Sequence, residues 1–161
     1  MEEKDTNRWF AQARELFEEM VNWLSSDSVC GLEHSELEKN LYVNGNELLR
    51  RLLQGYLDRR KEDEIEEDCL GSDGIKRTHK RQQSRKLSTI FGEVVVSRIA
   101  YGKRKIKSLK PLDGELNLPL EKYSHGLSER VASAVAFNGF DKTVEIIEKT
   151  TLLVLSKPKI G

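Results

Sequence analysis

Apolar side chains in the N-terminal part of the chain recur every three or four positions, which is the spacing of one face of an α-helix. The first such run consists of Trp9, Phe10, Ala13, Leu16, Phe17, Met20, Val21 and Leu24. The second consists of Leu37, Leu41, Leu48, Leu49, Leu52, Leu53, Tyr56 and Leu57. We therefore expect two amphipathic helices, whose apolar faces pack against each other as an antiparallel pair or against a second copy of the chain.

Short polar residues mark the ends of these helices. Asp5 or Thr6 can cap the first helix by accepting from free N–H groups of its first turn, and Ser25–Asp27 end it. Ser35 and Glu38 have the spacing of a capping box, which predicts the start of the second helix.

Asn44-Gly45 interrupts the second apolar run, and Asn44 with Glu47 could cap a fresh helix. An isolated glycine is tolerated inside a helix. We therefore favour one long helix, weakened at Gly45, over two short ones.

A dense run of carboxylates follows the second apolar run. It contains Glu62, Asp63, Glu64, Glu66, Glu67 and Asp68. Such a run invites a metal-binding or catalytic interpretation, but nothing in the sequence holds these side chains in one geometry. We expect a helix end that continues into a solvated linker, followed by a flexible joint at residues 71–75.

Beyond the joint the period of the pattern changes. Residues 87–101 are rich in β-branched and aromatic side chains, and Phe91-Gly92-Glu93 supplies a turn. In the second half of this stretch Val94, Val96 and Arg98 share one face of an extended strand, because alternate residues point to the same side. The pattern predicts a β-hairpin.

Two short helices are expected near the C-terminus. Ser124 or Gly126 begins the first, Asn138-Gly139 ends it, and Asp141 caps the second. The pair resembles the opening of a helix-turn-helix, but no third helix to enter a major groove precedes Gly161.

The formal net charge of zero conceals blocks of opposite sign. Residues 1–75 contain 9 Lys/Arg and 19 Asp/Glu, whereas residues 76–110 contain 12 Lys/Arg and one acid, Glu93. The cations of the second block are Lys76, Arg77, Lys80, Arg81, Arg85, Lys86, Arg98, Lys103, Arg104, Lys105, Lys107 and Lys110. This asymmetry indicates a polyanion partner, with nucleic acid as the first candidate, and these residues as its contacts.

Three of these cations alternate along the chain. Lys103, Lys105 and Lys107 would share one side of an extended segment at intervals of roughly 6.6 Å. A solvated charge run is the plain alternative. We favour binding, because the cations have almost no compensating acids and flank a rigid hairpin.

Composition adds limits to this picture. With 37% hydrophobic and 34% charged residues, the chain is lean for one compact core, so we expect an extended α+β protein that is mainly helical. No apolar run is long enough for a transmembrane helix, and the acidic start differs from a signal peptide. Cys30 and Cys69 stand alone, which favours neither a disulfide framework nor a zinc site.

The expected organisation has five parts. They are an acidic amphipathic helical region at 1–70, a flexible joint at 71–75, a basic β-hairpin region at 76–120, two short helices at 121–151 and an atypical tail at 152–161.

Several short phrases occur in an order that resembles one family. They are Gly31-Leu-Glu-His-Ser-Glu-Leu-Glu38, Asn44-Gly-Asn-Glu-Leu-Leu49, Leu53-Gln-Gly-Tyr-Leu57, Arg77-Thr-His79, Thr89-Ile-Phe-Gly-Glu-Val94, Ser108-Leu-Lys-Pro-Leu-Asp113, Leu116-Asn-Leu-Pro119 and Tyr123-Ser-His-Gly-Leu127. Together they resemble the N-terminal half of the Kra-type insertion-sequence transposases, which are common in cyanobacteria and related to other bacterial DDE transposases. The resemblance covers roughly residues 7–151.

The chain departs from this family in three places. Members continue with a ribonuclease-H-like domain whose acidic triad holds divalent metals, and no such domain or catalytic residue is found here. Relatives often carry a Cys-x-x-Cys pair after the hairpin tyrosine, whereas residues 102–106 contain no cysteine. After Thr151 the apolar Leu152–Leu155 suggests a frameshifted or prematurely ended reading frame.

The resemblance implies a DNA-binding N-terminal fragment of a transposase that is not an enzyme. The alternatives are an interaction protein that modulates a full-length transposase, or a decaying reading frame. We expect DNA, in particular element ends, as the partner, with self-association or a full-length transposase at the N-terminal helices and no membrane. No cofactor or metal is expected in this chain, and the expected location is the cytoplasm, at the nucleoid.

Overall fold

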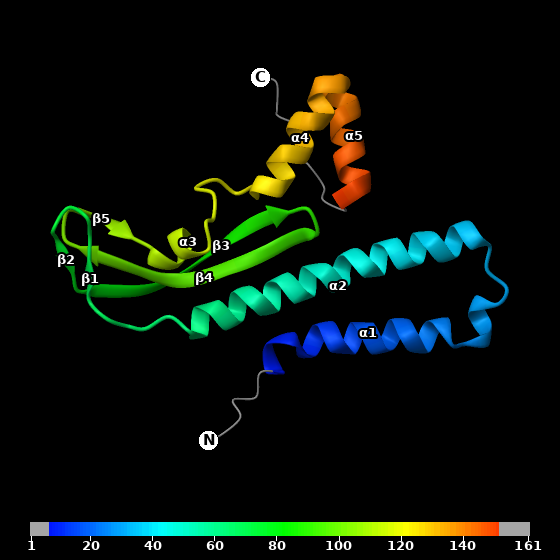
Figure 1. The fold of residues 1–161 in the computed structure, drawn as a ribbon, viewed down its shortest axis with the longest axis horizontal. Coiled ribbons are helices and arrows are strands. Elements are labelled where there is room, and N and C mark those ends of the chain that lie inside the picture. Colours follow the sequence, from blue (N-terminus) through cyan, green and yellow to red (C-terminus); the bar gives the residue numbers. More distant parts are fainter. Residues whose placement is uncertain (1–6, 152–161) are drawn as a thin grey trace.

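The computed structural model describes residues 7–151 and combines long helices with small antiparallel sheets. Two antiparallel helices lie along one side, a twisted three-stranded sheet lies beside them, and two short helices stand at one end of the sheet (Figure 1). The predicted α+β, mainly helical fold class is confirmed. No helix among the described residues is long and apolar enough to cross a membrane.

Two helices form the N-terminal part, as the apolar spacing predicts. A short 3-10 turn, η1 (Arg8–Phe10), leads into α1 (Ala11–Leu24), and a second one, η2 (Asp27–Val29), precedes α2 (His34–Glu62). The second helix is continuous, which confirms one long helix through Gly45.

The caps predicted for the two N-terminal helices are not confirmed. Glu33 is the N-cap of α2 and makes no side-chain cap hydrogen bond, so the capping box predicted at Ser35 and Glu38 is wrong. Both residues lie inside the helix because it begins at His34, two residues earlier than that motif requires. The proposed caps Asp5 and Thr6 lie outside the described residues.

Helix α2 and the turn η1 approach closely at one glycine. A Cβ atom added to Gly55 would lie 2.4 Å from the carbonyl oxygen of Trp9 and 2.8 Å from Cδ1 of Phe10. Ala13 and Leu16 of α1, which follows η1 directly, are also buried. A residue larger than glycine at position 55 would therefore force α2 and η1 apart.

The predicted β-hairpin is confirmed and is longer than the apolar pattern indicated. Strand β3 (His79–Thr89) pairs with β4 (Gly92–Lys103), and Leu87 lies opposite Val94. A third strand, β5 (Ile106–Leu109), pairs with the end of β4, so the strand order is β3-β4-β5. Much of the basic sequence around the hairpin is therefore strand.

Helix α2 and the hairpin share one hydrophobic core. Leu57 of α2 packs with Leu87, Val94 and Val96, and Leu53, Leu116 and Leu118 pack around them. These contacts cross residues 71–75, which form the turn between β1 (Cys69–Leu70) and β2 (Lys76–Arg77). The segment that the sequence predicts as a flexible joint thus lies within a short hairpin.

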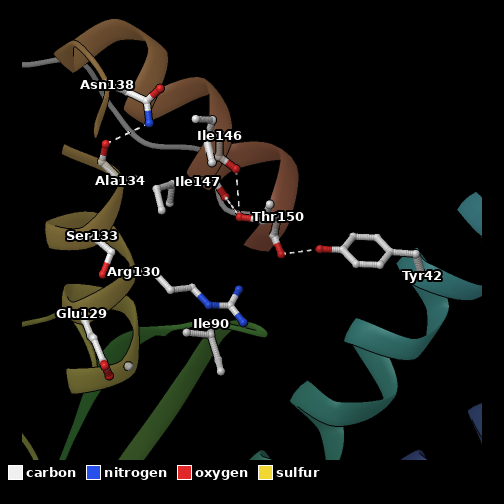
Figure 2. Close-up of a pocket in the computed structure, with 11 residues that line it drawn as sticks. Tyr42, Ile90, Glu129, Arg130, Ser133, Ala134, Asn138, Ile146, Ile147 and Thr150 are labelled. Carbon is white, nitrogen blue, oxygen red and sulfur yellow. Dashed lines mark hydrogen bonds between the residues drawn. The ribbon is translucent and has the colours of Figure 1, made fainter. Parts of the chain in front are cut away.

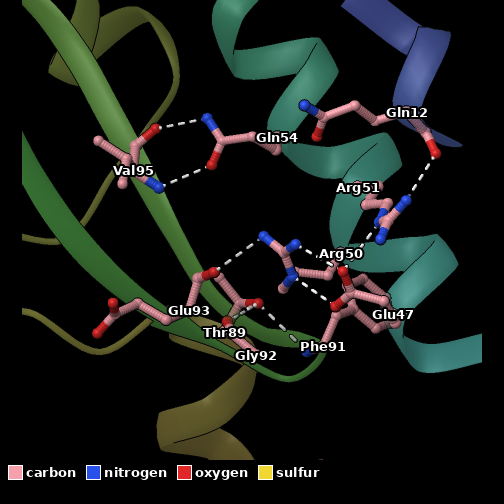
Figure 3. A network of polar contacts seen from close by, with 10 residues as sticks. All are labelled: Gln12, Glu47, Arg50, Arg51, Gln54, Thr89, Phe91, Gly92, Glu93 and Val95. Atoms are coloured by element: carbon pink, nitrogen blue, oxygen red, sulfur yellow. Dashed lines mark hydrogen bonds and ion pairs between the residues drawn. The ribbon is translucent and has the colours of Figure 1, made fainter. Parts of the chain in front are cut away.

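Helix α2 also covers the edge of β4 that β5 leaves open. The side-chain amide of Gln54 donates to the carbonyl of Val95 at 2.9 Å and accepts from its N–H at 2.8 Å (Figure 3). Further along, the carboxylate of Glu64 accepts from the N–H of Ile99 at 3.0 Å. These contacts replace a neighbouring strand and protect the edge from pairing with another chain. They also correct the expectation that the acidic run is a purely solvated linker.

Three further helices complete the fold. They are α3 (Pro111–Glu115), α4 (His125–Phe137) and α5 (Phe140–Thr151). Ser124 caps α4 as predicted, since its hydroxyl accepts from the N–H of Leu127. Asp141 lies in the first turn of α5 rather than before it. The atypical tail at 152–161 lies outside the described residues.

Candidate nucleic-acid interface

The two long strands place their side chains on two different faces. Leu87, Val94 and Val96 are buried on the inner face, which α2 and the segment after α3 cover. On β3 the outer face carries Lys80, Gln82, Ser84 and Lys86, all exposed. The basic block is therefore divided between the interior and the surface.

Arg98 belongs to the interior. Its side chain is 4% exposed, and Nε donates to Oδ1 of Asp113 at 2.8 Å. Nη2 donates to the other carboxylate oxygen at 3.2 Å, and Nη1 donates to the carbonyl of Gln83 at 3.3 Å. The carboxylate of Asp113, which comes from α3, thereby ties that helix to β4, and Arg98 is not available to a phosphate.

Arg77 is also held inside, at 2% exposure. It donates to both carboxylate oxygens of Asp73, at 2.8 and 3.1 Å, and to the carbonyl of Lys107 at 3.0 Å. The Arg77 guanidinium lowers the pKa of Asp73 to about 2, because it stabilises the ionised carboxylate. This arginine fastens the β1–β2 turn to β5.

Arg85 binds backbone carbonyls instead of a carboxylate. Its guanidinium donates to the carbonyls of Pro119 at 2.6 Å, Glu121 at 2.9 Å and Leu120 at 3.3 Å. It holds the connection between α3 and α4 against β3. Arg77, Arg85 and Arg98, all predicted DNA contacts, thus have structural partners.

Three lysines of the basic block have surface partners. Lys76 lies 3.0 Å from a carboxylate oxygen of Asp68, and Lys86 lies 2.9 Å from Glu93. Lys80 donates to the carbonyl of Glu66 at 2.8 Å and lies 3.9 Å from Asp68. The acidic run thus folds back beside the basic strands and neutralises part of their charge. Exposed pairs of this kind contribute little to stability and exchange readily with water or a ligand.

The remaining cations have no partner for their charged groups among the described residues. We call this set the basic turn; it consists of Arg81, Lys103, Arg104, Lys105, Lys107 and Lys110. Cross-strand pairs place Arg81 opposite Ala100 and Lys103 opposite Ile106, so the six lie at one end of the sheet. This is the end remote from α4 and α5 (Figure 1).

The geometry of the basic turn differs from the prediction for Lys103, Lys105 and Lys107. Strand β4 ends at Lys103 and β5 begins at Ile106, so Arg104 and Lys105 form a two-residue turn. Lys105 has a φ of 62°, a left-handed conformation that occurs at the second central residue of some tight turns. The prediction that the three lysines share one side of an extended segment is wrong, and they instead surround a hairpin tip.

The acidic run borders this end of the sheet. Burial raises the pKa of Glu64, although the N–H of Ile99 opposes the shift, and the carboxylates of Glu115 and Asp113 raise it further. Burial and nearby carboxylates likewise raise the pKa of Tyr101, whose hydroxyl donates to the carbonyl of Ile65. No group of three or more His, Cys, Asp or Glu side chains within residues 7–151 could hold a metal ion.

A second cationic position, which the sequence pattern does not predict, lies beside helices α4 and α5. An open groove of about 850 Å³ is lined by Tyr42, Ile90 and Arg130 together with side chains of α4 and α5. The hydroxyl of Tyr42 donates to the carbonyl of Thr150 at 2.6 Å, and the guanidinium of Arg130 extends toward Ile90 (Figure 2). Arg130 stands alone in a nearly neutral stretch of sequence, so charge density gave no signal for it.

Comparison of the chain with models of protein families, with curated proteins and with solved structures gave no match.

Proposed function

We propose that this protein binds DNA through the phosphate backbone and that the basic turn makes the main contact. The observation that supports the proposal is the division of the basic block. Within residues 7–151, six of its cations have no partner for their charged groups and lie at one end of the sheet, while the others are paired or buried. Unpaired cations gain most from phosphates, because their binding releases the counterions condensed on the nucleic acid.

The shape of the basic turn favours DNA over a small anion. Small anions are usually held by converging side chains or by N–H groups at a helix start. The side chains of Lys103, Arg104 and Lys105 instead surround an exposed hairpin tip, which suits a long, regularly charged surface. Phosphate contacts attract and position a protein but do not read sequence, so we expect weak sequence preference.

The ordered phrases that resemble Kra-type transposases point to element-end DNA as the natural target and to a role in transposition without catalysis. We also propose a second candidate role, in which the chain associates with a full-length transposase and modulates it. The exposed apolar side chains of α1 and α2, among them Phe17 and Leu49, favour this second role.

The test compares two triple variants in binding to a short duplex. Lys103→Gln, Arg104→Gln and Lys105→Gln together should weaken binding by about tenfold or more at low salt, since each lost phosphate contact lowers the affinity. The matched control replaces Lys39, Lys61 and Lys122 with glutamine, which removes the same charge from other surfaces. Equal losses in the two variants would show that net charge, rather than the basic turn, determines binding.

A further inference from the structure

Helix α2 has an exposed apolar seam in addition to the faces that contact α1 and the sheet. Positions three and four residues apart along α2 form this seam, which consists of Tyr42, Gly45, Leu49, Leu52, Tyr56 and Arg59. This is the 3-4 spacing of a helix that packs against another helix. Gln54 and Leu57, which contact β4 and the core, lie on a different side of α2.

Helix α1 extends the apolar surface. A groove of about 410 Å³ between the two helices is lined by Phe10, Ala13 and Phe17 of α1 and by Leu48 and Leu52 of α2. Val21 and Leu24 follow Phe17 by one and two helical turns and lie on the same side. The six large apolar side chains of this surface are 38% to 52% exposed; they are Phe17, Val21, Leu24, Leu49, Leu52 and Tyr56.

We infer that a second copy of this chain covers this surface, with the two α2 helices antiparallel about a twofold axis between Leu49 and Leu52. In that register Leu49 of one copy packs on Leu52 of the other, and Tyr56 packs on Gly45. The ring of Tyr42, whose hydroxyl keeps its hydrogen bond to the carbonyl of Thr150, then offers its face to the guanidinium of Arg59. A twofold dimer requires such a self-complementary patch, and this seam pairs large residues with small ones and an aromatic ring with a cation.

Gly45 supplies the space that this register needs. A Cβ atom added at Gly45 would have no neighbour within 4 Å, so the helix surface is open there. Arg59 is exposed, and its guanidinium has no partner within residues 7–151. Neither feature makes a contact within the described part of the chain, and the antiparallel register uses both.

The available area is sufficient for a specific interface. At their observed exposure, six large apolar side chains offer roughly 500 Å² per copy. Two copies then bury roughly 1,000 Å², which is about the minimum for a specific interface, and Tyr42 and Arg59 add to this area. The inference does not rest on DNA binding, since the basic turn belongs to the opposite side of the fold from α1 (Figure 1).

The test measures the mass of the full-length chain by sedimentation equilibrium at micromolar concentration. The wild type should have twice the mass of one chain. Leu49→Glu alone and Leu52→Lys alone should each be monomeric, because each places two unpaired charges in the interface. An equimolar mixture should recover the dimer, because residue 49 of one copy then pairs its carboxylate with the amine at residue 52 of the other.

The matched control is Leu120→Arg, which adds a charge at a leucine that is 100% exposed and should leave the dimer intact. Circular dichroism should show that each variant keeps its helix content. A monomeric wild type, or a dimer that survives Leu49→Glu, would overturn the inference. A mixture that stays monomeric would overturn the antiparallel register.

Discussion

At the scale of single residues, the twelve cations of the basic block have two distinct roles. Arg98 and Arg77 are buried against carboxylates, whereas Arg104 and Lys105 are exposed at a hairpin tip. Composition cannot distinguish among the twelve, because a count of charged residues does not say which side chains are buried. The alternation of Val94, Val96 and Arg98 is the one sequence signal that assigns Arg98 to the inner face.

Arg98→Gln should lower the free energy of unfolding by about 2–3 kcal/mol, because it leaves the Asp113 carboxylate partly buried without its partner. Denaturant melts measure the loss. The salt dependence of DNA binding by the folded variant should match that of the wild type. A variant of unchanged stability whose DNA binding is weaker would place Arg98 in the interface and contradict its structural role.

The carboxylate of Glu47 helps to hold three elements together, namely α2, α1 and β4. It accepts from Arg50 at 2.7 Å and Arg51 at 2.9 Å, and these arginines donate to the carbonyls of Glu93 and Gln12 (Figure 3). The hydrogen bond from Arg50 is the main reason that the pKa of Glu47 falls to about 2. Helix α2 is thereby connected to both α1 and β4.

Glu47→Gln should cost about 1–2 kcal/mol of stability at neutral pH, after allowance for solvent screening of a partly exposed group. Because the folded-state pKa is lowered, the stabilisation is complete above the unfolded-state value of 4.5 and is lost as the pH falls toward about 2. Urea melts of both proteins across this range should converge at low pH. A stability difference that does not change between neutral pH and pH 2 would show that the ion pairs are not its source.

At the scale of elements, α2 is the central helix of the fold, because two of its sides contact different elements and a third side is exposed. One side contacts η1 at Gly55, another covers the edge of β4 through Gln54, and a third carries the exposed seam. The close contact at Gly55 determines how near η1, and the helix α1 that follows it, can lie to α2.

Gly55→Ala should destabilise the protein by about 1–3 kcal/mol, although alanine ordinarily favours a helix over glycine. The reason is that the added methyl group would overlap the Trp9 carbonyl. Gly126→Ala in α4 is the matched control, since its Cβ would meet only Ile90 at an ordinary 3.5 Å, and it should be neutral or slightly stabilising. Thermal melts compare the two, and equal effects would contradict the tight helix contact.

The helices and the hairpin could be predicted from sequence because their apolar periods are local. The contacts that join them could not. Nothing in the sequence around Gln54 indicates that its side-chain amide bonds to the backbone of Val95, 41 residues away. The tip at Arg104 and Lys105 also escaped prediction, because a run of basic residues carries no glycine or asparagine to mark its two-residue turn. Likewise, Asp113 has the sequence context of a turn residue, whereas it is the partner of Arg98.

At the scale of the whole molecule, the opposite charge blocks are partly brought together by folding. Asp68 of the acidic run lies against Lys76 and Lys80, and Glu93 lies against Lys86, so these two carboxylates neutralise one part of the basic block. The basic turn keeps its charge. Folding thus gathers the unpaired cations of the basic block at one end of the sheet. This positive surface is the basis of the proposed DNA contact.

The salt dependence of DNA binding tests this account most directly. If about five cations contact phosphates, the slope of log K against log salt should be near −4 to −5 for the wild type. Lys103→Gln, Arg104→Gln and Lys105→Gln together should flatten that slope by up to about 3, while the Lys39, Lys61 and Lys122 control should leave it unchanged. A slope that the basic-turn variant does not alter would contradict the account.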